Sequence, residues 1–187
     1  MATACEKNID RLPVRLMLED EARFGRMSDP RKCWAPPHFR PLVSLALVRE
    51  FVYAYAAVSP GDGCLDYWMA PKMNTEHMSQ FLARVRTAHP GEFILMILDG
   101  ASPHKSKDLK IPEHMVLIPL PPYSPELNPV ELIWNELRGK DFANRVFDSL
   151  VAVVSQLERG LATLAANKTA VKNLTCWPWI ADSINAN

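Results

Sequence analysis

The chain has 187 residues, a formal net charge of zero, 48% apolar residues and 22% charged residues. These values are typical of a soluble globular protein with one domain large enough to bury a core. Apolar runs such as Phe93–Leu98 are too short to cross a bilayer, and the first residues contain no apolar export signal. We therefore expect one cytoplasmic domain over residues 1–187, and the neutral charge argues against strong nucleic-acid binding by this chain alone.

The first part of the chain predicts three β-strands. Val14–Ala22 alternates between two faces, with Asp20 at the end of the apolar face. Leu42–Val58 is rich in apolar and aromatic residues and suits a second strand. After the turn at residues 59–63, Cys64–Met69 suits a third strand. Three successive strands indicate an antiparallel meander.

A helix and two more strands follow. Asn74 or Thr75 can cap the helix, and the helix should end at His89. The apolar positions of the helix have helical spacing: Met78, Phe81, Leu82 and Val85. Phe93–Leu98 is apolar on both faces, as expected for a central strand. Met115–Leu120 suits the next strand.

The remaining residues predict helices. One begins near Pro129, with Asn128 as its N-cap and an apolar stripe of Val130, Ile133, Trp134 and Leu137. A longer helix covers roughly residues 148–166, with Leu150, Val151, Val154, Leu157 and Leu161 facing inward. The tail around Trp177 and Trp179 suits a short final helix.

This order predicts an α/β fold: a mixed five-stranded sheet, made of a three-strand antiparallel meander and two parallel strands, with helices on both faces. Ribonuclease H-like domains have this order. Their first and fourth strands are adjacent and parallel, which would place Asp20 beside Asp99.

The four cysteines, Cys5, Cys33, Cys64 and Cys176, are scattered and include no CxxC pair. This spacing indicates neither a zinc site nor a disulfide framework. We expect reduced, structural thiols.

Three carboxylates are the candidate site residues, and each has a plainer explanation. Asp20 can be a solvated strand end, although alternation points it inward, where an unpaired carboxylate is costly to bury. Asp99 can bond backbone amides in a turn, although ligands commonly bind beyond the carboxyl ends of strands. Glu131 can complete a capping box with Asn128, or its helix can turn it toward the sheet.

If the three carboxylates meet, they suit two Mg²⁺ or Mn²⁺ ions. Such ions can activate a water or a 3′-hydroxyl and stabilise the leaving oxygen of a phosphodiester. If the carboxylates lie far apart, the non-enzymatic explanation of each one holds.

Basic residues near these acids are candidate phosphate contacts. His104 and Lys105 follow Asp99, and His104 can also carry a proton. Further along the chain are Lys107, Lys110, Arg138 and Lys140. A second basic segment suits DNA contact by charge and stacking: Arg23, Arg26, Arg31, Lys32 and Arg40 with Trp34 and Phe39. The plainer explanations are a solvated charged face and, for Trp34, packing.

Three segments carry a family resemblance: Asp20–Gly25 (DEARFG), Leu98–Ser106 (LDGASPHKS) and Tyr123–Trp134 (YSPELNPVELIW). They resemble the signature blocks of DDE transposases, in the bacterial insertion-sequence branch of the Tc/mariner superfamily. The resemblance implies a ribonuclease H-like catalytic core in which Asp20, Asp99 and Glu131 bind Mg²⁺ or Mn²⁺. It also implies cleavage at transposon ends and strand transfer into target DNA, with His104, Lys105, Asn128 and Arg23 as supporting residues or DNA contacts.

The chain departs from the family pattern in three places. Thirty-one residues separate Asp99 from Glu131, slightly fewer than is usual, and Gly100 stands where asparagine is common. The nineteen residues before Asp20 cannot hold the family's helix-turn-helix region. We therefore expect a catalytic domain without that region, which acts on DNA with a separate helix-turn-helix polypeptide or as a homodimer, at the bacterial nucleoid. The alternatives are an inactive remnant and another ribonuclease H-like nuclease.

Overall fold

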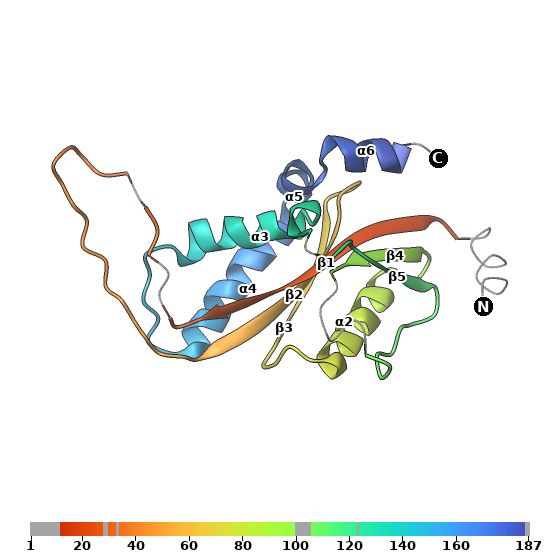
Figure 1. Ribbon diagram of the computed structural model, residues 1–187, viewed down its shortest axis with the longest axis horizontal. Helices are drawn as coiled ribbons and strands as arrows, with labels where there is room; N and C mark the ends of the chain where they lie inside the picture. Colours follow the sequence, from red (N-terminus) through yellow and green to blue (C-terminus); the bar gives the residue numbers. More distant parts are fainter. Residues whose placement is uncertain (1–11, 28–29, 33, 100–105, 123, 186–187) are drawn as a thin grey trace.

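The computed structural model describes residues 12–27, 30–32, 34–99, 106–122 and 124–185, and its centre is a five-stranded sheet (Figure 1). The strand order is β3-β2-β1-β4-β5. The bounds are Val14–Gly25 for β1, Phe51–Ser59 for β2, Cys64–Ala70 for β3, Phe93–Leu98 for β4 and Met115–Pro119 for β5. The first three strands pair antiparallel, whereas β1 with β4 and β4 with β5 pair in parallel. The predicted ribonuclease H-like sheet is confirmed.

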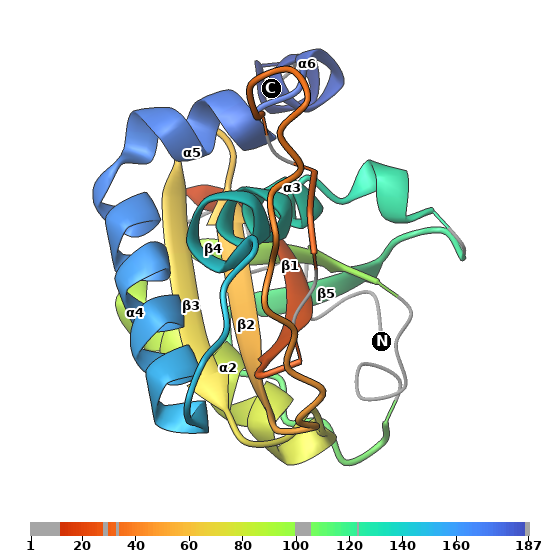
Figure 2. The same cartoon turned by 90° about the vertical axis from the view of Figure 1, so that its left-hand side faces the viewer.

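Helices cover both faces of the sheet, as Figures 1 and 2 show. One face carries α2 (Thr75–Ala88). The other carries α3 (Val130–Leu137), α4 (Leu150–Ala166) and α5 (Lys168–Thr175), and α6 (Pro178–Asn185) follows at the C-terminal side. No helix in the described part of the chain is long and apolar enough to cross a membrane.

The predicted caps and apolar stripes of α2 and α3 position these helices. Asn74 caps α2 by accepting a hydrogen bond of 2.8 Å from the His77 amide. The buried residues of α2 are the four predicted ones, Met78, Phe81, Leu82 and Val85, and those of α3 are Val130, Ile133, Trp134 and Leu137. Helical periodicity alone therefore identified the faces that both helices turn toward the sheet.

The second strand is shorter than predicted, because Leu42–Glu50 is not a strand. In Figure 1 this segment belongs to a long loop that extends away from the sheet beyond the end of β1. The first residue of β2, Phe51, pairs with Gly25, the last residue of β1. The Glu50 carbonyl still accepts a hydrogen bond of 3.1 Å from the Arg26 amide, but the ladder between β1 and β2 ends with Gly25 opposite Phe51. The apolar composition before Phe51 was therefore insufficient to make a strand.

Two helical predictions also need correction. Val151 of α4 is 73% exposed, whereas Val153 is fully buried, so the buried face of α4 is rotated from the predicted one. Gln156 also lies on the buried face of α4. Its side chain donates a hydrogen bond of 2.8 Å to Asp141, and a hydropathy pattern cannot predict such a contact. The segment after α4 forms α5, which the sequence analysis did not predict.

Replacing Gly63 by alanine should destabilise the protein by about 2 kcal/mol or more. Gly63 has a φ of +71°, and a Cβ there would lie 2.0 Å from the carbonyl oxygen of Lys168. The left-handed conformation alone costs other residues about 1–2 kcal/mol. Urea unfolding measures the loss. The matched control is Gly91→Ala, where a Cβ meets nothing within 4 Å and the change should stay within about 0.5 kcal/mol. Equal stabilities would contradict the packing of this turn against α5.

Candidate active site

Asp20 points from β1 toward α3. Its side chain is only 9% exposed, and its Oδ2 accepts a hydrogen bond of 2.8 Å from Nε1 of Trp134. The residue pairs across the sheet with Ala56 of β2, so it sits in the interior of the sheet and not at a frayed end. The predicted inward orientation of Asp20 is confirmed.

Asp99 directly follows β4 at the same edge of the sheet. The parallel pairing of β1 with β4 ends with Leu18 opposite Ile97. Continuing that register by two residues brings Asp99 beside Asp20, and neighbouring strands lie about 4.8 Å apart. Asp99 is exposed, which suits a residue that reaches a ligand from solvent.

Glu131 lies in the first turn of α3, three residues before Trp134, so both side chains project from one side of the helix. The competing capping box is not formed, since the described residues include no hydrogen bond from the Asn128 backbone N–H to the Glu131 carboxylate. Asn128 caps by itself: its Oδ1 accepts from the Val130 amide over 3.2 Å. Its Nδ2 donates to the Glu19 carbonyl over 2.8 Å, which ties the start of α3 to β1.

Burial and the charges of nearby carboxylates act on Asp20. The pKa of Asp20 is raised from 3.8 to about 7, first by burial and then by the negative charge of Glu131. Asp99 and Glu21 raise it further, while the hydrogen bond from Trp134 lowers it. Asp20 therefore lies close enough to both Glu131 and Asp99 for their charges to raise its pKa, and metal binding by the three carboxylates stays a prediction.

Glu19 is an acidic residue to which the sequence analysis gave no role. It lies on the opposite face of β1 from Asp20 and is fully buried. Burial, followed by the charges on Glu21, Asp20 and Asp99, raises its pKa well above the usual range. Its neighbour on the same face, Met17, is also fully buried. Because Met17 lies two positions before Glu19 on the same face of β1, this apolar residue was the sequence signal that both faces of β1 are buried.

The other predicted supporting residues have different outcomes. His104 and Lys105 lie outside the described residues. Arg23 is exposed at the end of β1, where its guanidinium lies 4.3 Å from the centre of the Phe51 ring. Lys140 pairs with Glu136. Trp34 is fully exposed at 103%, so the expectation that it packs is wrong.

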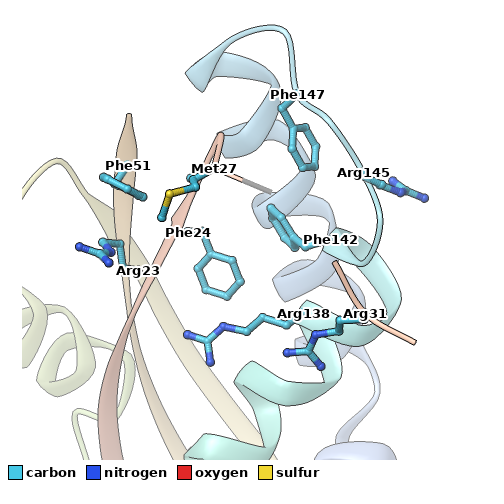
Figure 3. Close-up of a pocket in the computed structure, with 10 residues that line it drawn as sticks. Arg23, Phe24, Met27, Arg31, Phe51, Arg138, Phe142, Arg145 and Phe147 are labelled. Carbon is cyan, nitrogen blue, oxygen red and sulfur yellow. The ribbon is translucent and has the colours of Figure 1, made fainter. Parts of the chain in front are cut away.

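A basic and aromatic pocket of about 300 Å³ opens beyond Asp20, past the end of β1. Figure 3 shows Arg31 and Arg138 near Phe24, with Arg23 and Phe51 side by side. The Arg138 guanidinium lies 5.4 Å from the centre of the Phe24 ring. Ten residues line the pocket, and none of them is acidic: Arg23, Phe24, Gly25, Met27, Arg31, Phe51, Arg138, Phe142, Arg145 and Phe147. Such a surface suits a ligand with negative charge and flat rings.

Known proteins resemble this chain in sequence and in fold. Residues 15–153 match the sequence profile of the family described as DDE superfamily endonuclease. The uncharacterized protein y4pE/y4sA of Sinorhizobium fredii (strain NBRC 101917 / NGR234) is 37% identical over 106 residues, which are 56% of this chain and 78% of that protein.

Two solved structures have a similar fold. The Mos1 transposase paired-end complex with left transposon end gives a TM-score of 0.57 at 16% identity, over 91% of this chain and 57% of that one. The Mos1 mariner paired-end complex with Mn gives 0.57 at 17% identity, over 86% and 56%. The chain therefore spans little more than half the length of the Mos1 chains, and at these identities the likeness establishes the fold.

Replacing Asp20 by asparagine should stabilise the metal-free protein at pH 8 and flatten its pH dependence. The folded chain keeps a proton on Asp20 up to about pH 7, whereas the unfolded chain loses it near the ordinary pKa of 3.8. The penalty is therefore absent below about pH 4, grows as the pH rises and is complete above about pH 7. At about 1.4 kcal/mol per pKa unit, it is on the order of 4 kcal/mol.

Urea unfolding at pH 4.5 and pH 8 with a chelator present measures this effect. The asparagine side chain still offers an oxygen that can accept the hydrogen bond from Trp134. A change in stability therefore reports the loss of the carboxylate charge and not the loss of this hydrogen bond. Asp108→Asn, at an exposed position, should leave both values unchanged. Some pH dependence should persist in Asp20→Asn because the raised pKa of Glu19 acts in the same direction. Equal destabilisation of Asp20→Asn at both pH values would contradict the electrostatic account.

Proposed function

Because the chain belongs to the DDE superfamily of endonucleases, as its sequence blocks predicted, we propose that it is the catalytic domain of a transposase. It cleaves DNA at transposon ends and joins the freed 3′-hydroxyl to target DNA. The observation that supports this most is the closeness of three carboxylates from separate elements, Asp20, Asp99 and Glu131. Burial, and then the charges of Glu131 and Asp99, raise the pKa of Asp20.

Asp20, Asp99 and Glu131 would hold divalent metal, with Mg²⁺ or Mn²⁺ as the cation. Their oxygen atoms are the donors that hard cations prefer. The raised pKa of Asp20 also fits, because crowded carboxylates repel one another and a cation relieves that repulsion. The Mos1 transposase, similar in fold, is known in complexes with Mn and with Mg. Two bound ions would activate the attacking oxygen and stabilise the leaving oxygen.

The protein side of this chemistry is the positioning of the acids. Trp134 holds one oxygen of Asp20, which leaves the other available to a ligand. Asn128 anchors the helix start to β1 through the Glu19 carbonyl and so fixes where Glu131 projects. Asp99, at the end of β4, would be the third carboxylate ligand and is exposed to solvent.

The basic and aromatic pocket would hold DNA next to this site. Phe24 is four residues beyond Asp20 on β1, about 13 Å along a strand. Arg138 is seven residues beyond Glu131, about 10 Å along a helix. Successive nucleotides rise about 3.4 Å along a DNA strand, so the pocket lies three to four nucleotides from the scissile phosphate. Arginines there would contact phosphates while phenylalanines stack on bases.

Asp99→Ala should abolish Mn²⁺-dependent nicking of DNA by the purified chain. Losing a metal ligand removes several kcal/mol of transition-state stabilisation, and at about 1.4 kcal/mol per tenfold the rate should fall at least a hundredfold. Relaxation of supercoiled plasmid measures this. The control is Asp108→Ala, which removes an exposed acid from the segment between β4 and β5. Equal nicking by Asp99→Ala would rule out the mechanism, and no nicking by the unaltered chain would favour an inactive remnant.

Arg138→Ala should weaken binding of a short DNA duplex and reduce its dependence on salt. One lost phosphate contact lowers the slope of log affinity against log salt by about 0.9. Fluorescence anisotropy at several salt concentrations measures both effects. Arg84→Ala is the matched control, because Arg84 lies over Trp68 on the α2 side of the sheet. An unchanged slope in Arg138→Ala would exclude this pocket as a phosphate contact.

The same titration tests the proposed partners. The net charge of zero suits a catalytic domain whose end recognition comes from a separate helix-turn-helix polypeptide, or from a homodimer assembled on DNA at the nucleoid. Binding by the isolated chain should therefore be weak and independent of sequence. Tight, sequence-specific binding by the chain alone would contradict a need for a separate reader.

A further inference from the structure

The edge of the sheet opposite the parallel strands brings three kinds of metal ligand together. Cys64 and Asp66 are two residues apart on β3, so both project toward the α2 face. His89 directly follows the last turn of α2. One ligand atom from each residue, a sulfur, a carboxylate oxygen and a ring nitrogen, lies within 4.8 Å of the other two. Nε2 of His89 is 2.6 Å from Oδ2 of Asp66.

We propose that Cys64, Asp66 and His89 form a binding site for a divalent transition-metal ion of the Zn²⁺ class. Tetrahedral zinc bonds of about 2.0–2.3 Å place ligand atoms roughly 3.3–3.8 Å apart, so side-chain rotations that move atoms by about 1 Å convert the observed cluster into a site. A water takes the fourth position. The thiol proton and the proton shared by His89 and Asp66 leave for solvent when the ion binds.

A second layer of side chains holds these ligands in place. Oε2 of Glu92 lies 3.4 Å from Nδ1 of His89, the ring nitrogen that faces away from Asp66. A carboxylate on the far nitrogen is the usual partner of a metal-bound histidine, because it orients the ring. Arg15 bonds both Glu92 and Asp62, and Asp62 accepts the Cys64 backbone N–H over 3.0 Å. Glu92 therefore holds His89, Asp62 holds the backbone at Cys64, and Arg15 links Glu92 to Asp62.

The chemistry of the cysteine favours a metal ligand over a nucleophile. A nucleophilic cysteine needs an electropositive setting that stabilises its thiolate, whereas Cys64 lies between two carboxylates, Asp62 and Asp66, which suit a bound cation. Among the described residues no hydrogen bond to the thiol is found. A sulfur, nitrogen and oxygen set selects a zinc-like ion over Mg²⁺, which prefers oxygen ligands.

This site is separate from the carboxylates of the candidate active site. Asp66 pairs with Ala57, and Ala57 pairs with Glu19, so Asp66 lies two strands from β1, about 10 Å at the usual strand spacing. Asp20 points to the opposite face, toward Trp134. The inference therefore does not depend on the proposed function. A bound ion would clamp the edge strand β3 to the end of α2.

Cobalt titration tests the site. The chain is first stripped with a chelator and then titrated with Co²⁺ while its absorption spectrum is recorded. We expect thiolate-to-cobalt charge transfer in the near ultraviolet, visible bands of tetrahedral intensity, and loss of both when Zn²⁺ is added. Cys64→Ser should abolish the charge-transfer band, and Glu92→Gln should weaken Zn²⁺ affinity by about ten- to a hundredfold.

Matched variants make the result decisive. A chain with Cys5, Cys33 and Cys176 replaced by serine should keep the full cobalt spectrum, because Cys64 is then the one remaining thiol. Glu131→Gln should also keep it, because that residue belongs to the other site. Circular dichroism confirms that Cys64→Ser is folded. Charge transfer that survives in Cys64→Ser, or a cobalt spectrum without thiolate character in the unaltered chain, would overturn the proposal.

Discussion

The hydrogen bond from Trp134 to Asp20 joins the helix that carries Glu131 to the central strand of the sheet. Both partners are buried and the bond is 2.8 Å long, so breaking it would leave a buried polar group unsatisfied, at a cost of about 1–3 kcal/mol. Asn128 adds a second tie, from the loop before α3 to the Glu19 carbonyl. Because of these two hydrogen bonds, the direction in which Glu131 projects is set by the contacts of α3 with β1, and not by a capping box at the start of α3.

That arrangement has an electrostatic cost. Burial, followed by the charges of Glu131, Glu21 and Asp99, raises the pKa of Asp20 to about 7. Burial also raises the pKa of Glu19, on the other face of the same strand, well above the usual range. Apolar packing on both faces of β1, from Met17, Leu18 and their neighbours, stabilises the strand against this repulsion. Sites that concentrate like charges are commonly less stable than they would be without their function.

The two faces of the sheet suit different cations. The face under α3 carries the carboxylates of the candidate active site, whose oxygen atoms match hard ions, and lies next to a pocket rich in arginine. The face under α2 brings Cys64, Asp66 and His89 together at the edge strand, a mixed set that matches a softer ion. Because the sheet separates them, the ligands proposed for one site can be substituted without changing those proposed for the other.

The sequence by itself determined the elements whose periodicity is strong. The buried residues of α2 and α3, the whole of β4, and the inward orientation of Asp20 all follow from the spacing of apolar residues, because a regular backbone repeats its faces at a fixed period. The three sequence blocks also determined the family, since each carries its residues in one continuous segment.

Only the tertiary structure decided features that depend on a partner distant in sequence. Leu42–Glu50 is not a strand because the ladder between β1 and β2 ends with Gly25 opposite Phe51. Val151 is exposed because contacts with the sheet, and not hydropathy, set the rotation of α4. The sequence around Glu131, taken alone, favoured a capping box, whereas in the structure Asn128 caps α3 without the Glu131 carboxylate. The sequence around Cys64 did not indicate a metal site, because the third proposed ligand, His89, lies at the end of α2. Spacing along a chain does not encode distance across a fold.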